Sequence, residues 1–260
     1  MADYTHAACV GGGTIYIQKV VDYDLYCYYS AGVVAEGLAR IVSAAGKEAP
    51  SISGLLEMTS SIGLLMQKTN ILRDYREDTE QRRYFWPKEI WGKKQYGFNE
   101  MREMYEAIEA DGGRVTSQKA KTALYVQSEL VVDALRHTTD VLDGFSLLRD
   151  EGVFRAIAVP TTMAMATLQL CFMNPEVFLG RVKISKADSV RVGIVSHQFR
   201  ILSDPLAVFP KVFMGANNAR GTVAMWVEYA RKIRAKADPS DPNFLKISIA
   251  CGRVCLYPHA

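Results

Sequence analysis

Apolar residues recur at helical spacing over most of this chain, and this periodicity is the feature that most limits its fold. Strand signals are scarce, and the segments between the periodic runs are short and rich in Gly, Pro and Asn. Asp24 is expected to cap the first long helix. The sequence therefore predicts an all-α helical bundle, with its longer helices over 24–45, 53–78, 116–148, 154–172, 188–202 and 222–236.

Composition limits the kind of protein further. The chain has 260 residues, of which 49% are hydrophobic and 23% charged, with a formal net charge of +3. This length and balance suit one globular domain, and the mixed charges argue against a nucleic-acid partner. We expect a poorly defined segment over 1–21, a helical domain over 22–250 and a tail over 251–260.

Metal-binding and membrane signals are weak in most of the sequence. The histidines have no zinc-site spacing, so we expect them at surface or helix-capping positions: His6, His137, His197 and His259. The apolar stretch from Ala156 to Met173 is interrupted by Pro160 and several polar residues, which favours a buried helix over a membrane span. No secretory signal is visible.

One helix carries an unusual acidic cluster. Asp74, Glu77 and Asp78 follow Gln67 and Asn70 on the second long helix. At about 100° per residue, Asp74 and Asp78 point within about 40° of each other. Two carboxylates one turn apart suit Mg²⁺ shared with a substrate diphosphate. The alternative is a solvated helix end, in which Asp74 and Glu77 pair with Arg73, Arg76 or Arg82.

An aromatic stretch marks the first long helix. Tyr26 shares a helical face with Ser30, Val33 and Gly37. Small residues beside a phenol leave room for a ligand, although aromatic residues at helical spacing are more often part of the core. From the residues alone both interpretations stay open.

Taken together, six segments resemble the squalene synthase family (farnesyl-diphosphate farnesyltransferase), in family order over roughly residues 20–245. The acidic cluster lies in the second of the six, which are Tyr26-Cys-Tyr-Tyr-Ser-Ala-Gly, Gln67-Lys-Thr-Asn-Ile-Leu-Arg-Asp-Tyr-Arg-Glu-Asp, Phe85-Trp-Pro-Lys-Glu-Ile-Trp, Pro160-Thr-Thr-Met-Ala-Met-Ala-Thr, Val182-Lys-Ile and Asp238-Pro-Ser-Asp-Pro. The resemblance implies an isoprenoid-synthase-type helical bundle. It also implies a prenyl transferase that joins two farnesyl diphosphates into presqualene diphosphate and reduces this to squalene with NADPH.

The resemblance also assigns roles to residues. It implies Tyr26 as the catalytic phenol and Phe154 as an aromatic wall near the carbocations. Metal ligands would be Asp74, Glu77 and Asp78, holding Mg²⁺. Substrate contacts would come from Gln67, Asn70, Arg73, Arg83 and Pro160, and contacts to NADPH from Arg73, Lys183, Ser185 and Lys186.

Family context further implies a monomer on the cytosolic face of the endoplasmic reticulum membrane. We expect no transmembrane helix in this chain, and we expect the chain as it stands to be soluble or cytoplasmic. The family carries a second acidic motif on an earlier helix, and this sequence has one copy only, so we expect the fold to be incomplete at its N-terminus. Thr161 and Ser185 depart from the family pattern where the reductive step needs its residues. The alternatives are a phytoene or dehydrosqualene synthase and a non-catalytic helical remnant.

Overall fold

The computed structural model describes residues 15–196 and 212–257 of the chain, and these residues are mainly helical, with two short strands. The all-α prediction is therefore confirmed. The longer helices are α2 (Val20–Cys27), α3 (Val33–Ala44), α4 (Leu56–Arg73), α5 (Tyr75–Glu80), α7 (Arg102–Ala110), α8 (Gln118–Leu135), α9 (Thr138–Leu147), α10 (Glu151–Cys171), α11 (Lys186–Ser196), α12 (Val212–Lys236) and α13 (Phe244–Cys255). Shorter elements are β1 (Ile15–Tyr16), the π-helical turn η1 (Tyr28–Gly32), η2 (Pro50–Gly54), β2 (Arg83–Tyr84), α6 (Lys88–Trp91) and η3 (Pro175–Val177).

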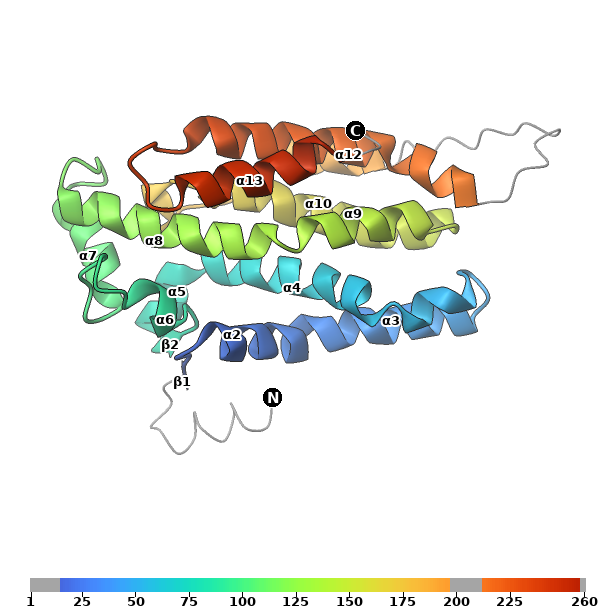
Figure 1. The fold of residues 1–260 in the computed structure, drawn as a ribbon, viewed down its shortest axis with the longest axis horizontal. Coiled ribbons are helices and arrows are strands. Elements are labelled where there is room, and N and C mark those ends of the chain that lie inside the picture. Colours follow the sequence, from blue (N-terminus) through green and yellow to red (C-terminus); the bar gives the residue numbers. More distant parts are fainter. Residues whose placement is uncertain (1–14, 197–211, 258–260) are drawn as a thin grey trace.

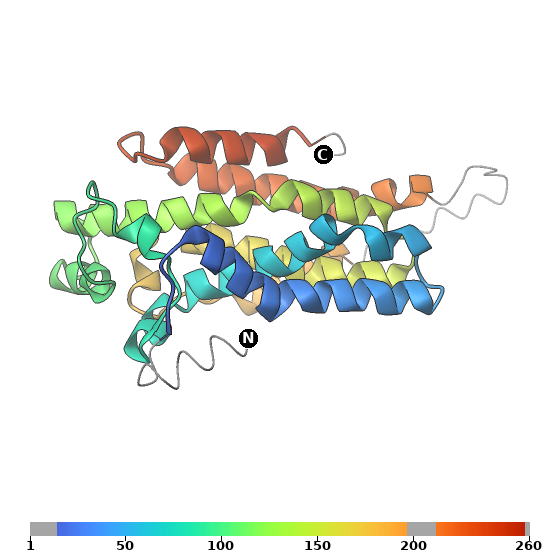
Figure 2. The ribbon, with the colours of Figure 1, turned by 60° about the horizontal axis from the view of Figure 1, so that its bottom comes forward.

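The long helices lie side by side in stacked layers, with α4 at the centre (Figure 1). One face of α4 meets α2, η1 and α3, and the other meets α8, α9 and α10. Helices α12 and α13 cover the far side of α8 and α9, as Figure 2 also shows. Because α4 contacts helices on both sides, most of its side chains are buried, and the large aromatic residues Phe145, Phe154 and Trp226 fill the neighbouring layer.

The first two predicted long helices differ from expectation in their ends and continuity. The first begins at Val20, so Asp24 lies inside α2, where it pairs with Lys68 and does not act as a cap. This helix also widens into η1 before α3 begins. The second is broken at Asp74, whose backbone leaves the helical region (φ −91°, ψ 11°) between α4 and α5.

Differences also occur towards the C-terminus. The segment predicted as one helix over 116–148 is interrupted at Arg136 and His137 into α8 and α9. Helix α13 was not predicted, and it crosses the domain boundary expected at residue 250. The predicted end of the 188–202 helix lies outside the described residues, as do His6, His197 and His259.

Helix α10 is long and apolar enough to cross a membrane by length and composition alone. In the fold, however, 56% of its apolar window is buried by other helices, and α10 packs between α4 and α12. This placement agrees with the expectation of a core helix.

Candidate active site

Tyr26 lies one residue before the end of α2, directly ahead of the π-helical turn η1. The Ser30 hydroxyl donates a hydrogen bond to the Tyr26 carbonyl at 2.8 Å. The turn packs closely on α4, because a Cβ atom at Gly63 would lie 2.6 Å from the backbone nitrogen of Gly32. π-Helical turns are frequent at functional sites, and this one sets the position of the Tyr26 backbone against the central helix.

The Tyr26 ring is half-buried and stacks on Phe85, with 4.8 Å between ring centroids and 29° between ring planes. Burial raises the pKa of the phenol above its ordinary value; the Asp78 carboxylate acts in the same direction, and the Arg83 guanidinium opposes it. Tyr26, Asp78 and Arg83 are therefore close enough to interact electrostatically, although they come from different elements.

The two aspartates predicted to bind a metal are each paired with an arginine. The Arg73 guanidinium donates to both carboxylate oxygens of Asp74 at 2.7 Å. The Arg83 guanidinium donates to Asp78 from Nε at 3.0 Å and from Nη2 at 2.6 Å. Burial raises the pKa of the Asp78 carboxyl, although Arg83 opposes this shift. The alternative interpretation, in which the acidic residues pair with nearby arginines, thus describes the pair of Asp74 and Arg73. Asp78 pairs with Arg83, and that interpretation did not include this pair.

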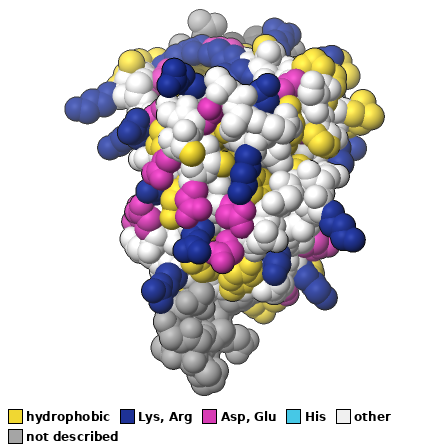
Figure 3. Space-filling model, turned by 90° about the vertical axis from the view of Figure 1, so that its left-hand side faces the viewer, with side chains coloured by type: hydrophobic (Ala, Val, Ile, Leu, Met, Phe, Trp, Pro, Cys, Tyr) yellow, Lys and Arg dark blue, Asp and Glu magenta, His cyan; other side chains and the backbone are white. Residues whose placement is uncertain are grey.

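The neighbouring residues Glu77 and Arg76 point elsewhere. Glu77 is exposed and accepts a hydrogen bond from Gln81 at 3.2 Å. Arg76 pairs with Glu80 and Glu109, each at 2.6 Å. Figure 3 views this end of the molecule, where acidic and basic side chains are interleaved. Such exposed pairs contribute little to stability.

The short parallel bridge between β1 and β2 fixes the backbone at Arg83. Ile15 pairs with Arg83 and Tyr16 with Tyr84, and the Ile17 amide donates to the Tyr84 carbonyl at 3.0 Å. This strand lies in the segment over 1–21 that was expected to be poorly defined, and the structure describes it at Ile15 and Tyr16.

Asp74 and Asp78 fit a Mg²⁺ site only as part of a larger donor set. Among residues 15–196 and 212–257, no group of three or more His, Cys, Asp and Glu side chains converges as a metal site would require. Two carboxylates can still hold Mg²⁺ when phosphate oxygens and water complete its shell. The partly exposed Asp74 and the Asp78 carboxylate supply the oxygen chemistry for that arrangement.

Gln67 and Asn70 lie on α4 between the cavity described below and Asp74. Gln67 is half-buried and Asn70 is exposed, and the Asn70 carbonyl accepts the Asp74 amide at 2.9 Å. Their spacing on α4 places both near the face of Asp74, as the sequence predicts.

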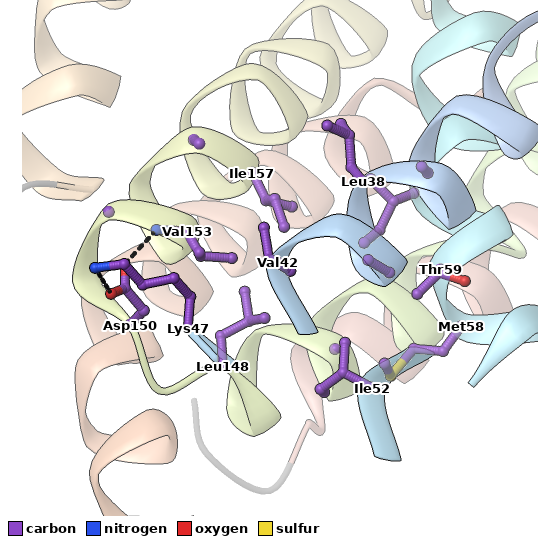
Figure 4. A pocket seen from close by; sticks show the side chains of 16 residues that line it. Leu38, Val42, Lys47, Ile52, Met58, Thr59, Leu148, Asp150, Val153 and Ile157 are labelled. Carbon is purple, nitrogen blue, oxygen red and sulfur yellow. Dashed lines mark hydrogen bonds and ion pairs between the residues drawn. The ribbon is translucent and has the colours of Figure 1, made fainter. Parts of the chain in front are cut away.

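An apolar cavity of about 330 Å³ lies between α3, α4, α9 and α10 (Figure 4). Its walls include Leu38 and Val42 from α3, Met58 from α4 and Ile157 from α10. Small residues such as Gly144 and Ala156 make the space available. The cavity can hold a hydrocarbon chain while excluding water from it.

Phe154 and Pro160 are not among the residues that line this cavity. Phe154 is buried in the core, with its ring edge-on to Phe145 at a centroid distance of 5.8 Å. Pro160 lies inside α10, where it is half-buried. The structure therefore does not bring these two residues to the cavity wall.

Three of the four residues expected to contact NADPH lie at or just before the start of α11, while the fourth, Arg73, ends α4. Lys183 and Lys186 are exposed. Ser185 instead caps α11, because its hydroxyl accepts the Asp188 amide at 3.0 Å and donates to the Asp188 carboxylate at 2.6 Å. The two lysines offer the charge that a phosphate needs, while Ser185 already has a structural role.

A buried charge cluster near Tyr26 was not predicted. Lys68 is fully buried and contacts Asp24 at 2.6 Å and Asp133 at 2.5 Å, and Arg136 contacts the same two carboxylates. The signal in the sequence is a single lysine on the apolar face of a central helix. The cluster ties α2, α4 and α8 together.

Comparison with known proteins places these features in a family. A sequence model of squalene/phytoene synthase matches residues 12–188, which contain Tyr26, the acidic cluster and Lys183. The chain is 44% identical to the squalene synthase of Ganoderma lucidum over 98% of this chain and 50% of that protein. It is 36% identical to the squalene synthase of Mycosarcoma maydis over 98% of this chain and 41% of that protein.

A solved structure described as the complex of TcSQS with the ligand E5700 superposes with a TM-score of 0.76 at 28% identity. The superposition covers 93% of this chain and 61% of that chain. The isoprenoid-synthase-type fold expected from the resemblance is therefore confirmed. The chain spans about half the length of the curated relatives it matches. On these matches, the chain belongs to the squalene/phytoene synthase family.

Proposed function

We propose that this protein acts in the condensation of two farnesyl diphosphates to presqualene diphosphate and in its NADPH-dependent reduction to squalene. The observation that carries the proposal is one phenol, Tyr26, that interacts electrostatically with the arginine-paired Asp78 on α5, with an apolar cavity further along α4. Relatives named squalene synthase, up to 44% identical, favour this reaction over phytoene synthesis.

Arg73 and Arg83 are the first partners for the substrate diphosphate. Each guanidinium is already positioned by a carboxylate at 2.6–3.0 Å, and planar guanidinium groups bind phosphate oxygens in pairs. Asp74 and Asp78 would hold Mg²⁺ together with the diphosphate, and the ion would supply positive charge for departure of the diphosphate.

Tyr26 holds its proton at Oη in the resting protein, because burial raises the pKa of the phenol. As a neutral phenol it can donate a hydrogen bond to the departing diphosphate. Once that group takes the proton, the phenolate oxygen can accept a proton from carbon during closure of the cyclopropane ring. The Phe85 ring, stacked on Tyr26 at 4.8 Å, fixes the plane of the phenol during this exchange.

The apolar cavity would keep the hydrocarbon end of the prenyl chain away from water. Its walls carry almost no polar groups that could act as nucleophiles, apart from Lys47, Thr59 and Asp150. The Thr59 hydroxyl is engaged with the carbonyls of Leu55 and Leu56. A prenyl chain in this space therefore meets hydrocarbon side chains and not solvent.

The reductive step would rely on Lys183 and Lys186 as contacts for the cofactor phosphate. Both lysines are exposed on one short segment, and an ammonium group binds phosphate as a point charge. This part of the proposal rests on fewer contacts than the condensation. Localisation at the endoplasmic reticulum membrane, as a monomer, belongs to the same proposal by family context.

A non-catalytic helical remnant is the second candidate, and one observation favours it. The described residues supply two arginine-neutralised aspartates and no third acidic ligand beside them. Such a chain could bind a prenyl diphosphate without turning it over.

Product analysis with matched tyrosine variants separates the two candidates. The purified chain is incubated with farnesyl diphosphate and Mg²⁺, with and without NADPH, and products are identified by mass spectrometry. Tyr26→Phe should lower product formation by about 100-fold or more, whereas Tyr29→Phe, at an exposed ring in the next turn, should not. Equal turnover in both variants would rule out the role of Tyr26. Diphosphate binding that depends on Arg73 and Arg83, without product from any form, would identify the remnant.

A further inference from the structure

The apolar cavity lies far from the acidic cluster along the central helix. Ile62 lines the cavity and precedes Asp74 by twelve residues, which is about 18 Å of helix axis. A prenyl chain anchored by its diphosphate at Asp74 would therefore reach this cavity with its distal end. What closes the cavity then decides how long a chain can be accommodated.

Two charged side chains stand at one side of the otherwise apolar wall. Lys47, just after α3, pairs with Asp150, just before α10, with 3.3 Å between Nζ and Oδ2 (Figure 4). Asp150 also caps α10 by accepting the Val153 amide at 3.0 Å. Next to them, Val153 and Leu148 form the last apolar surface.

The loop that carries Lys47 is fixed in place by its neighbour. The buried Glu48 carboxylate accepts the backbone amides of Arg149 and Asp150 at 3.0 Å. This contact joins the segment after α3 to the N-terminus of α10, where a carboxylate is favoured by the helix dipole. Lys47 and Asp150 are therefore held at the cavity edge by a rigid connection.

We propose that the Lys47–Asp150 ion pair is the length stop of the cavity and restricts the prenyl chain to the farnesyl class. This inference rests on the proposed function, because it names the chain that the cavity holds. A longer hydrocarbon chain would have to strip water from both charges without offering them a hydrogen bond, and that desolvation is strongly unfavourable. The pair itself is partly exposed, so its own contribution to stability is small.

The test compares a shorter and a longer prenyl alcohol in a variant without the charges. Lys47→Leu with Asp150→Asn removes both charges, and asparagine retains an oxygen that can cap α10. Farnesol and geranylgeraniol are titrated against a bound anilinonaphthalene dye; neither alcohol needs a metal or a diphosphate site. Lys47→Leu alone, at a side chain 63% exposed, serves as a second variant with little risk to folding.

A matched pair elsewhere provides the control. Lys119 and Glu103 form an ion pair at 2.9 Å with similar exposure, and Glu103 also accepts backbone amides, as Asp150 does. Neither residue lines the cavity. Lys119→Leu with Glu103→Gln should therefore leave the binding of both alcohols unchanged.

Wild-type protein is expected to bind geranylgeraniol no more tightly than farnesol. In the Lys47→Leu, Asp150→Asn variant, geranylgeraniol should gain about tenfold in affinity, which corresponds to burying roughly two further carbon atoms, and farnesol should stay unchanged. An unchanged ratio in both variants, with farnesol still bound, overturns the length stop alone. Failure of wild-type protein to bind either alcohol also overturns it, whereas the proposed reaction is judged separately by product formation from farnesyl diphosphate.

Discussion

Replacing Lys68 tests the arrangement of the central helices most sharply. Its ammonium group is fully buried between Asp24 and Asp133, and Arg136 balances the remaining negative charge. Lys68→Met removes one of two positive charges and leaves a surplus carboxylate in a poorly solvated site. Breaking a buried pair in this way costs about 3–5 kcal/mol, compared with about 0–1 kcal/mol for an exposed pair.

The assay is urea and thermal unfolding followed by circular dichroism. Lys68→Met should lower Tm by roughly 10 °C, while Lys119→Met, which breaks the more exposed pair with Glu103, should change it little. Adding Asp24→Asn to Lys68→Met restores charge balance, since Arg136 and Asp133 remain, and should recover part of the loss. A loss below about 1 kcal/mol for Lys68→Met would refute the buried cluster.

Other predictions concern the π-helical turn and a buried histidine. Gly63→Ala should destabilise the protein by about 1–3 kcal/mol, because its Cβ would meet the backbone of Ala31 and Gly32. Gly37→Ala, in open space on α3, should instead stabilise the protein by about 0.5–1 kcal/mol. The midpoints of urea unfolding compare the two variants. Burial lowers the pKa of His137 to about 3. The unfolded chain binds this proton below pH 6.5 and the folded chain does not until about pH 3, so stability falls as pH falls through this window. Between pH 7.5 and pH 5 the free energy of unfolding should fall by about 2 kcal/mol more in wild-type protein than in His137→Gln. Equal decreases in the two proteins, measured by urea unfolding, would contradict this prediction.

The periodic apolar pattern was sufficient to predict the bundle, because every long helix buries one face against another. The breaks were not predictable in the same way. The backbone leaves the helix at Asp74, and immediately after it the Tyr75 ring is fully buried against Trp86 and Phe178, with its hydroxyl donating to the Met101 carbonyl at 2.5 Å. These contacts come from distant segments, so local spacing carried no sign of them.

The candidate site was likewise only partly predictable from the sequence. Tyr26, Asp78 and Arg83 could be named from motifs, and they interact in the fold. The partners of Asp24 and His137 could not be named from motifs, because the burial of these side chains depends on tertiary packing. His137 was expected at a surface or helix-capping position. It does occupy the N-cap position of α9, without a side-chain cap hydrogen bond, but its ring is buried, with Nδ1 3.2 Å from the Ser61 hydroxyl.

A crystal structure with farnesyl thiodiphosphate and Mg²⁺ would show where the diphosphate and the hydrocarbon chain bind. We expect the diphosphate group within hydrogen-bonding distance of the Arg73 and Arg83 guanidinium groups, the Tyr26 hydroxyl facing it, and the hydrocarbon chain running towards Leu38 and Ile157. A diphosphate bound at the exposed lysines before α11, with the apolar cavity empty of the chain, would contradict this expectation.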